Sequence, residues 1–294
     1  MHPPPSPAGA IESASVDVAL ATCRVLPEPD IDEAPTLAAL RASGIDAGTI
    51  AWDDPDVDPS AARLTILRAT WSYPEDPAGF LAWVERAAAV TALWNPVAAV
   101  RWNLHKGYLL ELERAGVPVV ATCLVRRGET TPLAEILAAR GWSDVIIKPA
   151  VSAASRLTLR SGPQTLAAGE AHLRRVAARE DVLVQSYLPS VESYGERALV
   201  WIDGELTHAV RKASRLDGRN ESITGPVPIS PAEAEVARAA LAVVDAPLLY
   251  ARIDVAPGAD GSPRVMELEL IEPSLYFPYS REALERFVRA VRRL

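Results

Sequence analysis

Three acidic residues and an arginine near the C-terminal end have the types and spacing of a site that binds metal and phosphate. Arg252 and Asp254 stand two apart in one apolar run, and Glu267 and Glu269 stand two apart in the next. Because side chains alternate across a strand, each pair shares a face, and a hairpin turning at residues 257–262 would bring the two faces together. Three carboxylates in a half-buried sheet repel one another unless a cation neutralises them, and their hard oxygens suit Mg²⁺. The alternative is an exposed polar face in which Arg252 pairs with an acid.

A lysine and a run of small residues could supply phosphate contacts. Lys148 ends a predicted strand, and residues 150–155 (AVSAAS) follow it after Pro149. Small residues in a tight connection let backbone N–H groups approach phosphates closely, and a lysine at the strand end can pair with the same groups. An ordinary small turn between two strands is the competing interpretation.

Further basic residues and one apolar segment could complete a nucleotide site. Lys106 falls in the first turn of a helix predicted to begin near residue 103, and Arg211 and Lys212 end a strand. Residues 182–189 (VLVQSYLP) pass from a strand into a proline-bounded linker, where backbone groups could bind the edge of an adenine. For each of these features, a solvated surface charge or an ordinary linker is the alternative.

Arg68 and two aromatic residues after it could form a substrate pocket. Arg68 ends a predicted strand, and Trp71 and Tyr73 follow closely. A guanidinium can bind a carboxylate and aromatic rings can wall a pocket, which predicts a site for an amino-acid-like substrate. The alternative is that the rings are core aromatics between domains, although Arg68 would be costly to bury without a partner.

Length and composition predict a folded protein of one to three domains and exclude several functions. The chain has 294 residues, of which 49% are hydrophobic and 23% charged, and a net charge of −8. Such an acidic chain has no general attraction for nucleic acid or anionic membranes. Two cysteines, Cys23 and Cys123, are too few for a disulfide framework and form no CxxC zinc motif. No apolar run reaches the roughly 20 residues of a membrane helix. Residues 1–15 are expected to be a disordered tail and not a signal peptide, so a cytoplasmic location is expected.

The order of predicted elements gives an α/β part followed by an α+β part. In the first third, strands are predicted at residues 16–23, 44–52 and 64–67 and helices at 33–43 and 80–90, an alternation typical of a parallel sheet. The remainder has predicted helices at 103–115, 131–140, 164–179, 231–244 and 281–294, and predicted strands at 117–122, 145–148, 156–160, 182–187, 197–203, 205–212, 249–255 and 264–271. Asp203 and Gly204 predict a hairpin turn, so antiparallel pairs are expected here.

Taken in chain order, these features resemble the ATP-grasp superfamily, and glutathione synthetase and D-alanine–D-alanine ligase in particular. The ordered set runs from Lys106 to Tyr276, about three-fifths of the chain. The resemblance implies ATP and Mg²⁺ as cofactors. It also implies an ATP-grasp fold with an N-terminal parallel-sheet domain, residues 16–102, and two α+β subdomains that clasp ATP, residues 103–187 and 188–294.

The family's nucleotide-binding roles carry over to matching positions. The residues implied to bind ATP are Lys106, Lys148, Ser152 and Ser155 at the phosphates, Gln185, Tyr187 and Leu188 at the adenine, Glu196 at the ribose, and Lys212 with Arg211 at the γ-phosphate. Glu192 is the alternative ribose ligand. The loop at 150–155 has alanines where many members of the family have glycines, which could alter its mobility and its approach to phosphate.

The family's metal and catalytic roles fall on the acidic cluster. Asp254, Glu267 and Glu269 would ligate two Mg²⁺ ions, and Arg252 would stabilise the charge that develops on the acyl-phosphate and the tetrahedral intermediate. Glu269 stands where many relatives carry asparagine, which keeps an oxygen ligand and adds a negative charge.

Four motifs resemble a bacterial subgroup of the superfamily that includes the O-ureido-serine cyclo-ligase of cycloserine biosynthesis. The motifs are residues 68–73 (RATWSY), 94–96 (WNP), 101–106 (RWNLHK) and 269–274 (ELIEPS), so the resemblance spans nearly the whole chain. The residues assigned to the substrate pocket are Arg68, Trp71, Tyr73 and Ser274.

The implied activity is that of a carboxylate–amine ligase acting on an amino-acid-like small molecule. The carboxylate becomes an acyl-phosphate, a nitrogen nucleophile attacks it, and an amide forms. Cyclisation of O-ureido-D-serine to D-cycloserine is the implied case. The alternatives are an intermolecular peptide-type ligase and a catalytically inactive nucleotide-binding protein. A homodimer is also implied, because relatives are commonly dimeric.

Overall fold

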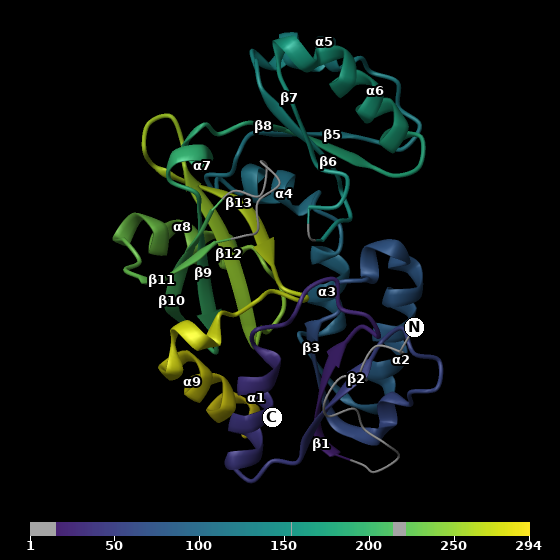
Figure 1. Cartoon of the computed structure of the whole chain (residues 1–294), viewed down its shortest axis with the longest axis vertical. Helices are drawn as coiled ribbons and strands as arrows, with labels where there is room; N and C mark the ends of the chain where they lie inside the picture. The colour runs from purple at the N-terminus through teal and green to yellow at the C-terminus, as the bar shows by residue number, and fades with distance from the viewer. Residues whose placement is uncertain (1–15, 154, 214–221) are drawn as a thin grey trace, which may run out of the picture.

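The N-terminal part of the chain forms a parallel sheet with helices on both faces (Figure 1). The computed structural model describes residues 16–153, 155–213 and 222–294, so the tail predicted at residues 1–15 lies outside the described residues. The sheet order is β2-β1-β3-β4, and every neighbouring pair is parallel. The strands are β1 (Val16–Thr22), β2 (Ala47–Ala51), β3 (Ala62–Ala69) and β4 (Ala92–Trp94). The helices packed on it are α1 (Glu33–Ala42), α2 (Pro77–Val90) and, from the end of the chain, α9 (Arg281–Val291).

Alternation along β1 explains how both faces of this sheet are covered. Val18 and Leu20 pack in one core cluster with α1 and α9, whereas Ala19 and Ala21 pack in another with α2. A strand buried on both faces reads as a continuous apolar run. The run at residues 16–23 therefore predicts this strand correctly.

The middle of the chain forms a four-stranded antiparallel sheet with the order β5-β8-β6-β7. The strands are β5 (Thr122–Val125), β6 (Val145–Pro149), β7 (Leu159–Ser161) and β8 (Val182–Ser186), and the helices beside them are α5 (Leu133–Arg140) and α6 (Leu166–Ala177). Val145 and Ile147 pack in the core formed with these two helices. Because side chains alternate, Ile146 and Lys148 point to the opposite face.

The C-terminal part forms a five-stranded antiparallel sheet with the order β11-β10-β9-β12-β13. The strands are β9 (Glu196–Ile202), β10 (Glu205–Lys212), β11 (Ile223–Val227), β12 (Tyr250–Pro257) and β13 (Pro263–Glu269), and the helices are α7 (Ser190–Ser193) and α8 (Pro231–Ala242). Ser230 and Glu233 form a capping box that starts α8. Asp203 and Gly204 both have positive φ, as the predicted hairpin turn requires.

The segment around Lys106 differs from the single helix predicted at residues 103–115. It consists of α3 (Val97–Asn103) and α4 (Tyr108–Arg114), and Lys106 lies in the connection between them. The Lys106 N–H donates to the carbonyl of Ala150 at 2.7 Å, outside any helical ladder. This tertiary bond, which periodicity cannot show, ties Lys106 to the small-residue segment after β6.

The strand predicted at residues 117–122 is also displaced, because β5 begins only at Thr122. The residues before it pair briefly with the edge of β13. Val265 donates to the carbonyl of Pro118 at 2.8 Å, and Val120 donates to the carbonyl of Val265 at 2.9 Å. The elements β4, β11, α3 and α7 were not predicted, because short segments carry little periodic signal.

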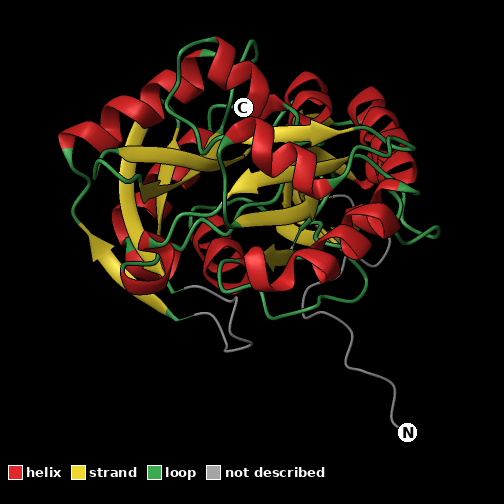
Figure 2. Cartoon of the chain, turned by 90° about the horizontal axis from the view of Figure 1, so that it is seen from above, coloured by secondary structure: helices red, strands yellow, loops and turns green. Residues whose placement is uncertain are grey.

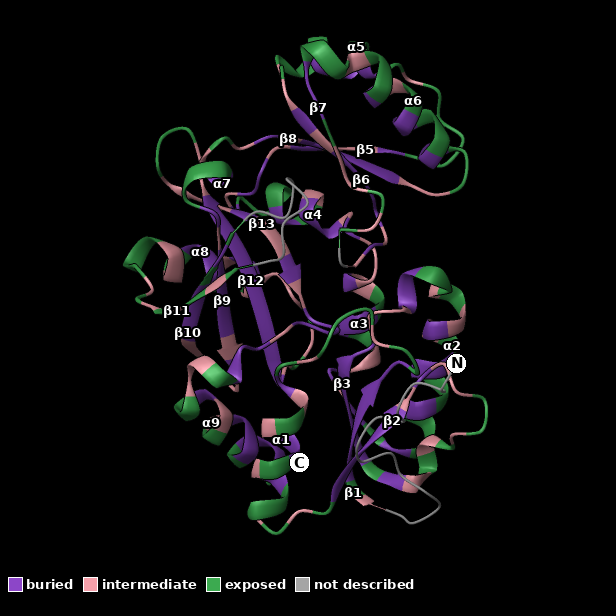
Figure 3. Cartoon of the chain, viewed as in Figure 1, coloured by how far each residue is buried: buried purple, intermediate pink, exposed green. Residues whose placement is uncertain are grey.

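The architecture is α/β followed by α+β, as the sequence predicts. Helices lie around the outside and strands between them (Figure 2), and the strands are the most continuously buried elements (Figure 3). The three sheets take their strands from residues 16–94, 196–269 and 122–186, while the exact domain boundaries stay predictions. Every helix in the described ranges is too short or too polar to cross a membrane.

A buried carboxylate ties the segment after β13 to the N-terminal sheet. Asp32 is fully buried and accepts hydrogen bonds from the backbone N–H groups of residues 275–277 at 2.5 to 3.1 Å. The guanidinium of Arg68, at the end of β3, lies 3.4 Å from the same carboxylate. Asp32 therefore fixes the path of the chain that leaves β13.

Replacing Asp32 with alanine is expected to lower the free energy of unfolding by roughly 3–5 kcal/mol. The change would leave buried backbone donors and the Arg68 charge without their partner. Denaturant unfolding followed by tryptophan fluorescence measures the loss. Asp58→Ala is the matched control, because Asp58 is an exposed cap that accepts from the Ser60 N–H, and its loss of stability should be much smaller. A loss for Asp32→Ala no larger than the control's would contradict this role.

Candidate active site

A cavity of about 520 Å³ is lined by residues of the two antiparallel sheets and by connecting segments, including those that follow β1 and β3 in the N-terminal part. It contains every site residue predicted from the sequence except Arg68 and Arg211. The predicted residues that line it are Trp71, Tyr73, Lys106, Lys148, Ser152, Ser155, Gln185, Tyr187, Leu188, Glu196, Lys212, Arg252, Asp254, Glu267, Glu269 and Ser274. Residues as far apart in the chain as Trp71 and Ser274 thus converge on one space.

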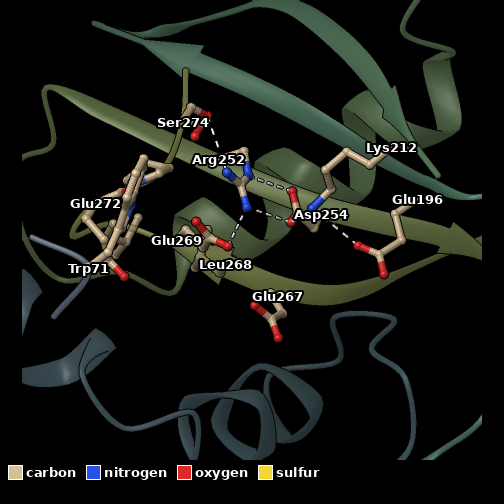
Figure 4. A network of polar contacts seen from close by, with 12 residues as sticks. Trp71, Glu196, Lys212, Arg252, Asp254, Glu267, Leu268, Glu269, Glu272 and Ser274 are labelled. Atoms are coloured by element: carbon tan, nitrogen blue, oxygen red, sulfur yellow. Dashed lines mark hydrogen bonds and ion pairs between the residues drawn. The ribbon is translucent and has the colours of Figure 1, made fainter. Parts of the chain in front are cut away.

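The hairpin of β12 and β13 brings the acidic cluster together. Its register pairs Arg252 with Glu269 and Asp254 with Glu267, so the four side chains share the face predicted by alternation. Arg252 donates to Asp254 from Nε at 2.9 Å and from Nη2 at 3.0 Å, and it also contacts Glu269 (Figure 4). Lys212 forms an ion pair with Asp254 at 2.5 Å. Burial alone would raise the pKa of Asp254, but Arg252 and Lys212 hold it below its ordinary value.

Two lysines from different segments converge on Glu267. The Nζ of Lys148 lies 2.5 Å from one carboxylate oxygen, and the Nζ of Lys106 lies 3.3 Å from the other. Burial would raise the pKa of Glu267, but the two lysines lower it strongly. Burial would likewise lower the pKa of Lys106, but the Glu267 charge raises it above its ordinary value. Both partners are therefore held in their charged forms.

Two other carboxylates carry charge that the basic side chains do not fully offset. Burial raises the pKa of Glu269, and its contact with Arg252 is opposed by the charges of Asp254 and Glu267. Burial and the neighbouring Glu269 raise the pKa of Glu272 to about 8. The ionised forms of Glu269 and Glu272 are therefore only partly compensated, and burial favours the protonated form of each in the ligand-free cavity.

The carboxylates fit Mg²⁺ together with oxygen ligands from another molecule. In the described part of the chain, no three His, Cys, Asp or Glu side chains are grouped to hold a metal ion alone. Asp254, Glu267 and Glu269 are each paired with a basic side chain instead. Mg²⁺ commonly takes one or two carboxylates and completes its shell with waters and substrate phosphates. The raised pKa of Glu269 shows negative charge that such a cation would stabilise.

The end of the cavity near β8 contains the residues predicted to bind adenine and ribose. Gln185 is buried, and its Nε2 donates to the Thr122 hydroxyl at 3.1 Å. Glu196 lines the cavity and lies 3.3 Å from Lys212. Glu192, the alternative ribose ligand, does not line the cavity; it accepts from the Tyr187 hydroxyl at 2.9 Å and pairs with Arg160. The geometry therefore favours Glu196 over Glu192 as the candidate ribose ligand.

Arg68 does not line the cavity, contrary to the prediction that it binds the substrate carboxylate. Its side chain is 3% exposed, pairs with Asp32, and donates to the Pro273 carbonyl at 2.9 Å. The guanidinium also lies 5.2 Å from the centre of the Tyr250 ring. The cost of burying an arginine is offset here by a partner 36 residues earlier, which the sequence pattern does not reveal.

Arg211 also lies outside the cavity, although it was predicted to accompany Lys212 at the γ-phosphate. Consecutive residues of a strand point to opposite faces, so only Lys212 of this pair can face Asp254. Arg211 is exposed, and its guanidinium lies 5.4 Å from the centre of the Tyr194 ring. The alternation rule could have excluded it from sequence alone.

Several lining residues were not identified from the sequence, and three of them are polar groups that contribute to the argument. Asn103 donates to the Leu268 carbonyl at 2.8 Å and accepts from the Leu270 N–H at 2.9 Å, and the Tyr108 hydroxyl accepts from the Leu268 N–H at 3.0 Å. These bonds satisfy the outer edge of β13. The third residue is Glu272, which lies within the 269–274 motif; that motif was its only sequence signal.

The sheets and the cavity define the class of protein. Two antiparallel α+β sheets that enclose lysines and carboxylates in one cavity form the ATP-grasp fold. The same fold is found in the ATP-grasp ligase PsnB complexed with a phosphomimetic variant of its minimal precursor, Mg and ADP, with a TM-score of 0.64 at 19% identity over 96% of this chain and 99% of that chain.

The relatives at higher identity define the family. The chain is 36% identical to the cycloserine biosynthesis protein DcsG of Streptomyces lavendulae, over 93% of this chain and 97% of the relative. The crystal structure of D-cycloserine synthetase DcsG matches with a TM-score of 0.86 at 35% identity, over 94% of this chain and 99% of that chain. Residues 18–95 match the family model for the N-terminal domain of D-cycloserine synthetase DcsG. The chain belongs to the DcsG family of ATP-grasp ligases, as the four sequence motifs predict.

Glu272→Gln is expected to stabilise the ligand-free protein at alkaline pH. A carboxyl whose pKa is raised on folding contributes stability below its unfolded pKa, about 4.3, and loses that contribution as pH rises through the folded pKa, about 8. Glutamine stays neutral, so the variant should gain at least about 1 kcal/mol over the wild type at pH 9 and almost nothing at pH 4.5.

Thermal unfolding across pH 4.5 to 9 in metal-free buffer measures this difference. Glu285→Gln is the matched control, because Glu285 is an exposed residue of α9 that pairs with Arg281. Its difference from the wild type should stay small throughout. The same difference for Glu272→Gln at both ends of the pH range would contradict the raised pKa.

Proposed function

We propose that this protein is an ATP- and Mg²⁺-dependent carboxylate–amine ligase that activates an amino-acid-like substrate as an acyl-phosphate. The observation that carries the proposal is the convergence of Lys106 and Lys148 on Glu267, beside the Arg252–Asp254 pair, in one buried cavity. Membership of the DcsG family supports the cyclisation of O-ureido-D-serine to D-cycloserine as the particular reaction.

In this proposal the nucleotide occupies the half of the cavity between β6, β8 and β10. Gln185, Tyr187 and Leu188 line the adenine, and Glu196 binds the ribose. Lys106 and Lys148 bind the phosphates, with Ser152 and Ser155 in the segment that closes over them, and Lys212 reaches the γ-phosphate. When bound, Mg²⁺ would neutralise charge on the phosphates, with Asp254, Glu267 and Glu269 as its protein ligands.

The residues of the chain contribute positioning and charge to both chemical steps. An oxygen of the substrate carboxylate attacks the γ-phosphorus in line, and ADP leaves. The lysines neutralise charge that spreads over the transferring group. A nitrogen then attacks the carbonyl carbon of the acyl-phosphate, Arg252 stabilises the developing oxyanion, and phosphate leaves. With O-ureido-D-serine, attack by the oxygen-linked nitrogen closes the ring, and water releases the carbamoyl group as carbon dioxide and ammonia.

Release of phosphate from ATP and Mg²⁺ tests the proposal. We expect release with O-ureido-D-serine, together with a product of the mass of D-cycloserine. Release with a second amine and formation of a linked product would indicate the intermolecular ligase. No release with any amino acid of a broad panel, from a protein that still binds ATP, would indicate an inactive nucleotide-binding protein.

Glu267→Gln is expected to reduce this turnover at least about 100-fold while the protein still folds. The amide keeps the size of the side chain but removes the charge that holds Lys106 and Lys148 and that would bind the metal ion. Phosphate release and circular dichroism measure the two properties. Glu285→Gln, on the exposed face of α9, should retain wild-type turnover. Normal turnover in Glu267→Gln would exclude Glu267 from the catalytic site.

Glu196→Ala and Glu192→Ala separate the two candidate ribose ligands. Because Glu196 lines the cavity and Glu192 does not, Glu196→Ala should raise the KM for ATP roughly tenfold, the loss of one or two hydrogen bonds to a carboxylate. Glu192→Ala should change that KM by no more than about twofold. ATP titrations of phosphate release measure both values. The reverse ranking would assign the ribose to Glu192.

The homodimer stays a prediction of the resemblance, and the cytoplasmic location stays a prediction from the composition and the N-terminal segment. A small-molecule substrate is proposed with the ligase activity, and the absence of nucleic-acid and membrane partners stays a prediction from the acidic net charge.

A further inference from the structure

Glu272 is the buried carboxylate of the cavity whose charge no described side chain pairs with. It is 8% exposed. The other acids at the centre of the cavity, one buried and two half-buried, have basic partners within ion-pair distance: Asp254 with Lys212 and Arg252, Glu267 with Lys106 and Lys148, and Glu269 with Arg252. Within residues 16–153, 155–213 and 222–294, Glu272 forms no such pair, and its carboxylate accepts a hydrogen bond from the Tyr73 hydroxyl. A buried carboxylate without a cation is unfavourable.

The backbone around Glu272 is held in place from the N-terminal sheet. Trp71 Nε1 donates to the Glu272 carbonyl at 3.0 Å, and Arg68 Nη2 donates to the Pro273 carbonyl at 2.9 Å. Asp32 fixes the N–H groups of residues 275–277 that follow. The position of this unpaired acid is thus fixed by bonds from a separate part of the fold. Such support is typical of a binding group and is more than a solvated surface acid needs.

Glu272 lies on the side of Arg252 away from the proposed nucleotide. In Figure 4, Lys212 and Glu196 lie to one side of Arg252, and Glu272 and Trp71 lie to the other. Toward the described residues, the Arg252 Nη1 makes a single long bond of 3.4 Å, to the Ser274 carbonyl, so it retains capacity to donate. In the proposed function, the carboxylate that receives the γ-phosphoryl group binds beside Lys212 and this guanidinium. The rest of its molecule then extends toward Glu272.

We propose that Glu272 binds the α-ammonium group of the substrate, so that the substrate is an α-amino acid whose carboxylate faces Arg252. The inference rests on the proposed function and names the substrate class of that site. An α-amino acid carries its ammonium and its carboxylate on the same carbon, and Glu272 and Arg252 line the same cavity with opposite charges. An ammonium group would supply the missing cation and a charge-assisted hydrogen bond. It would also favour the ionised form of Glu272 that burial disfavours.

Equilibrium binding of two matched ligands tests this role. The ligands are O-ureido-D-serine and its des-amino analogue 3-(ureidooxy)propanoic acid, titrated calorimetrically in the presence of ADP and Mg²⁺. For the wild type, loss of the ammonium should raise Kd roughly 10- to 100-fold, the range for a hydrogen bond between charged groups. For Glu272→Gln the two ligands should differ by less than about threefold, and Glu272→Asp should recover part of the preference. Glu285→Gln should behave as the wild type.

The outcomes separate this inference from the proposed function. If Glu272→Gln keeps the full preference for the ammonium, the inference is overturned, even when its turnover has fallen. If Glu272→Gln changes only the Mg²⁺ dependence, Glu272 belongs to the metal site and the inference is again overturned. If the wild type discriminates as expected but releases no phosphate, the proposed ligase activity fails while the ammonium site stands. If the wild type binds neither this pair nor any α-amino acid in preference to its des-amino counterpart, the inference is wrong.

Discussion

The structure depends on burying several carboxylates and several basic side chains in one cavity without leaving the charges unmatched. Removing each charge from water costs free energy. That cost is offset only when a group of opposite charge lies close by. Asp254 has two cations, Glu267 has two, and Glu269 shares Arg252 with Asp254. These ion pairs join the segments that contain Lys106, Lys148 and Lys212 to the hairpin of β12 and β13. A change in any one of these segments therefore alters the charge balance of the whole site.

This charge network requires an exact position for β13, which is an edge strand whose outer side pairs with backbone only briefly, through Val265. Side chains take the place of that neighbour. Asn103 and Tyr108, from the two ends of the connection that carries Lys106, bond to the backbone of Leu268 and Leu270. The same connection reaches the segment after Lys148 through the bond from Lys106 to Ala150. The interrupted helix is therefore what sets Lys106 and Lys148 opposite Glu267.

Rules of local structure were sufficient to predict the hairpin of β12 and β13. They could not predict contacts between residues far apart in the chain. Period-two alternation placed Arg252, Asp254, Glu267 and Glu269 on one face, and the register confirms it. Applied to Arg211 and Lys212, the same rule would have excluded Arg211. The role of Arg68 depended on Asp32, and the break in the helix at Lys106 depended on Ala150. Both are contacts between residues far apart in the chain, so the spacing of apolar residues does not reveal them. The family resemblance did not reveal them either.

The pairing within the cavity also accounts for how a charged nucleotide could enter it. In the ligand-free protein, Glu267 forms ion pairs with both Lys106 and Lys148. In the proposed reaction the phosphates take over the lysines, and the metal ion that accompanies them takes over Glu267, so each buried charge exchanges one partner for another. The ligand-free and nucleotide-bound states therefore need not differ greatly in electrostatic free energy, because each of these buried charges has a partner of opposite charge in both states. Among the described residues Glu272 has no basic partner to exchange, and in the role proposed for it the ionised form gains a partner only when the bound molecule brings a cation of its own.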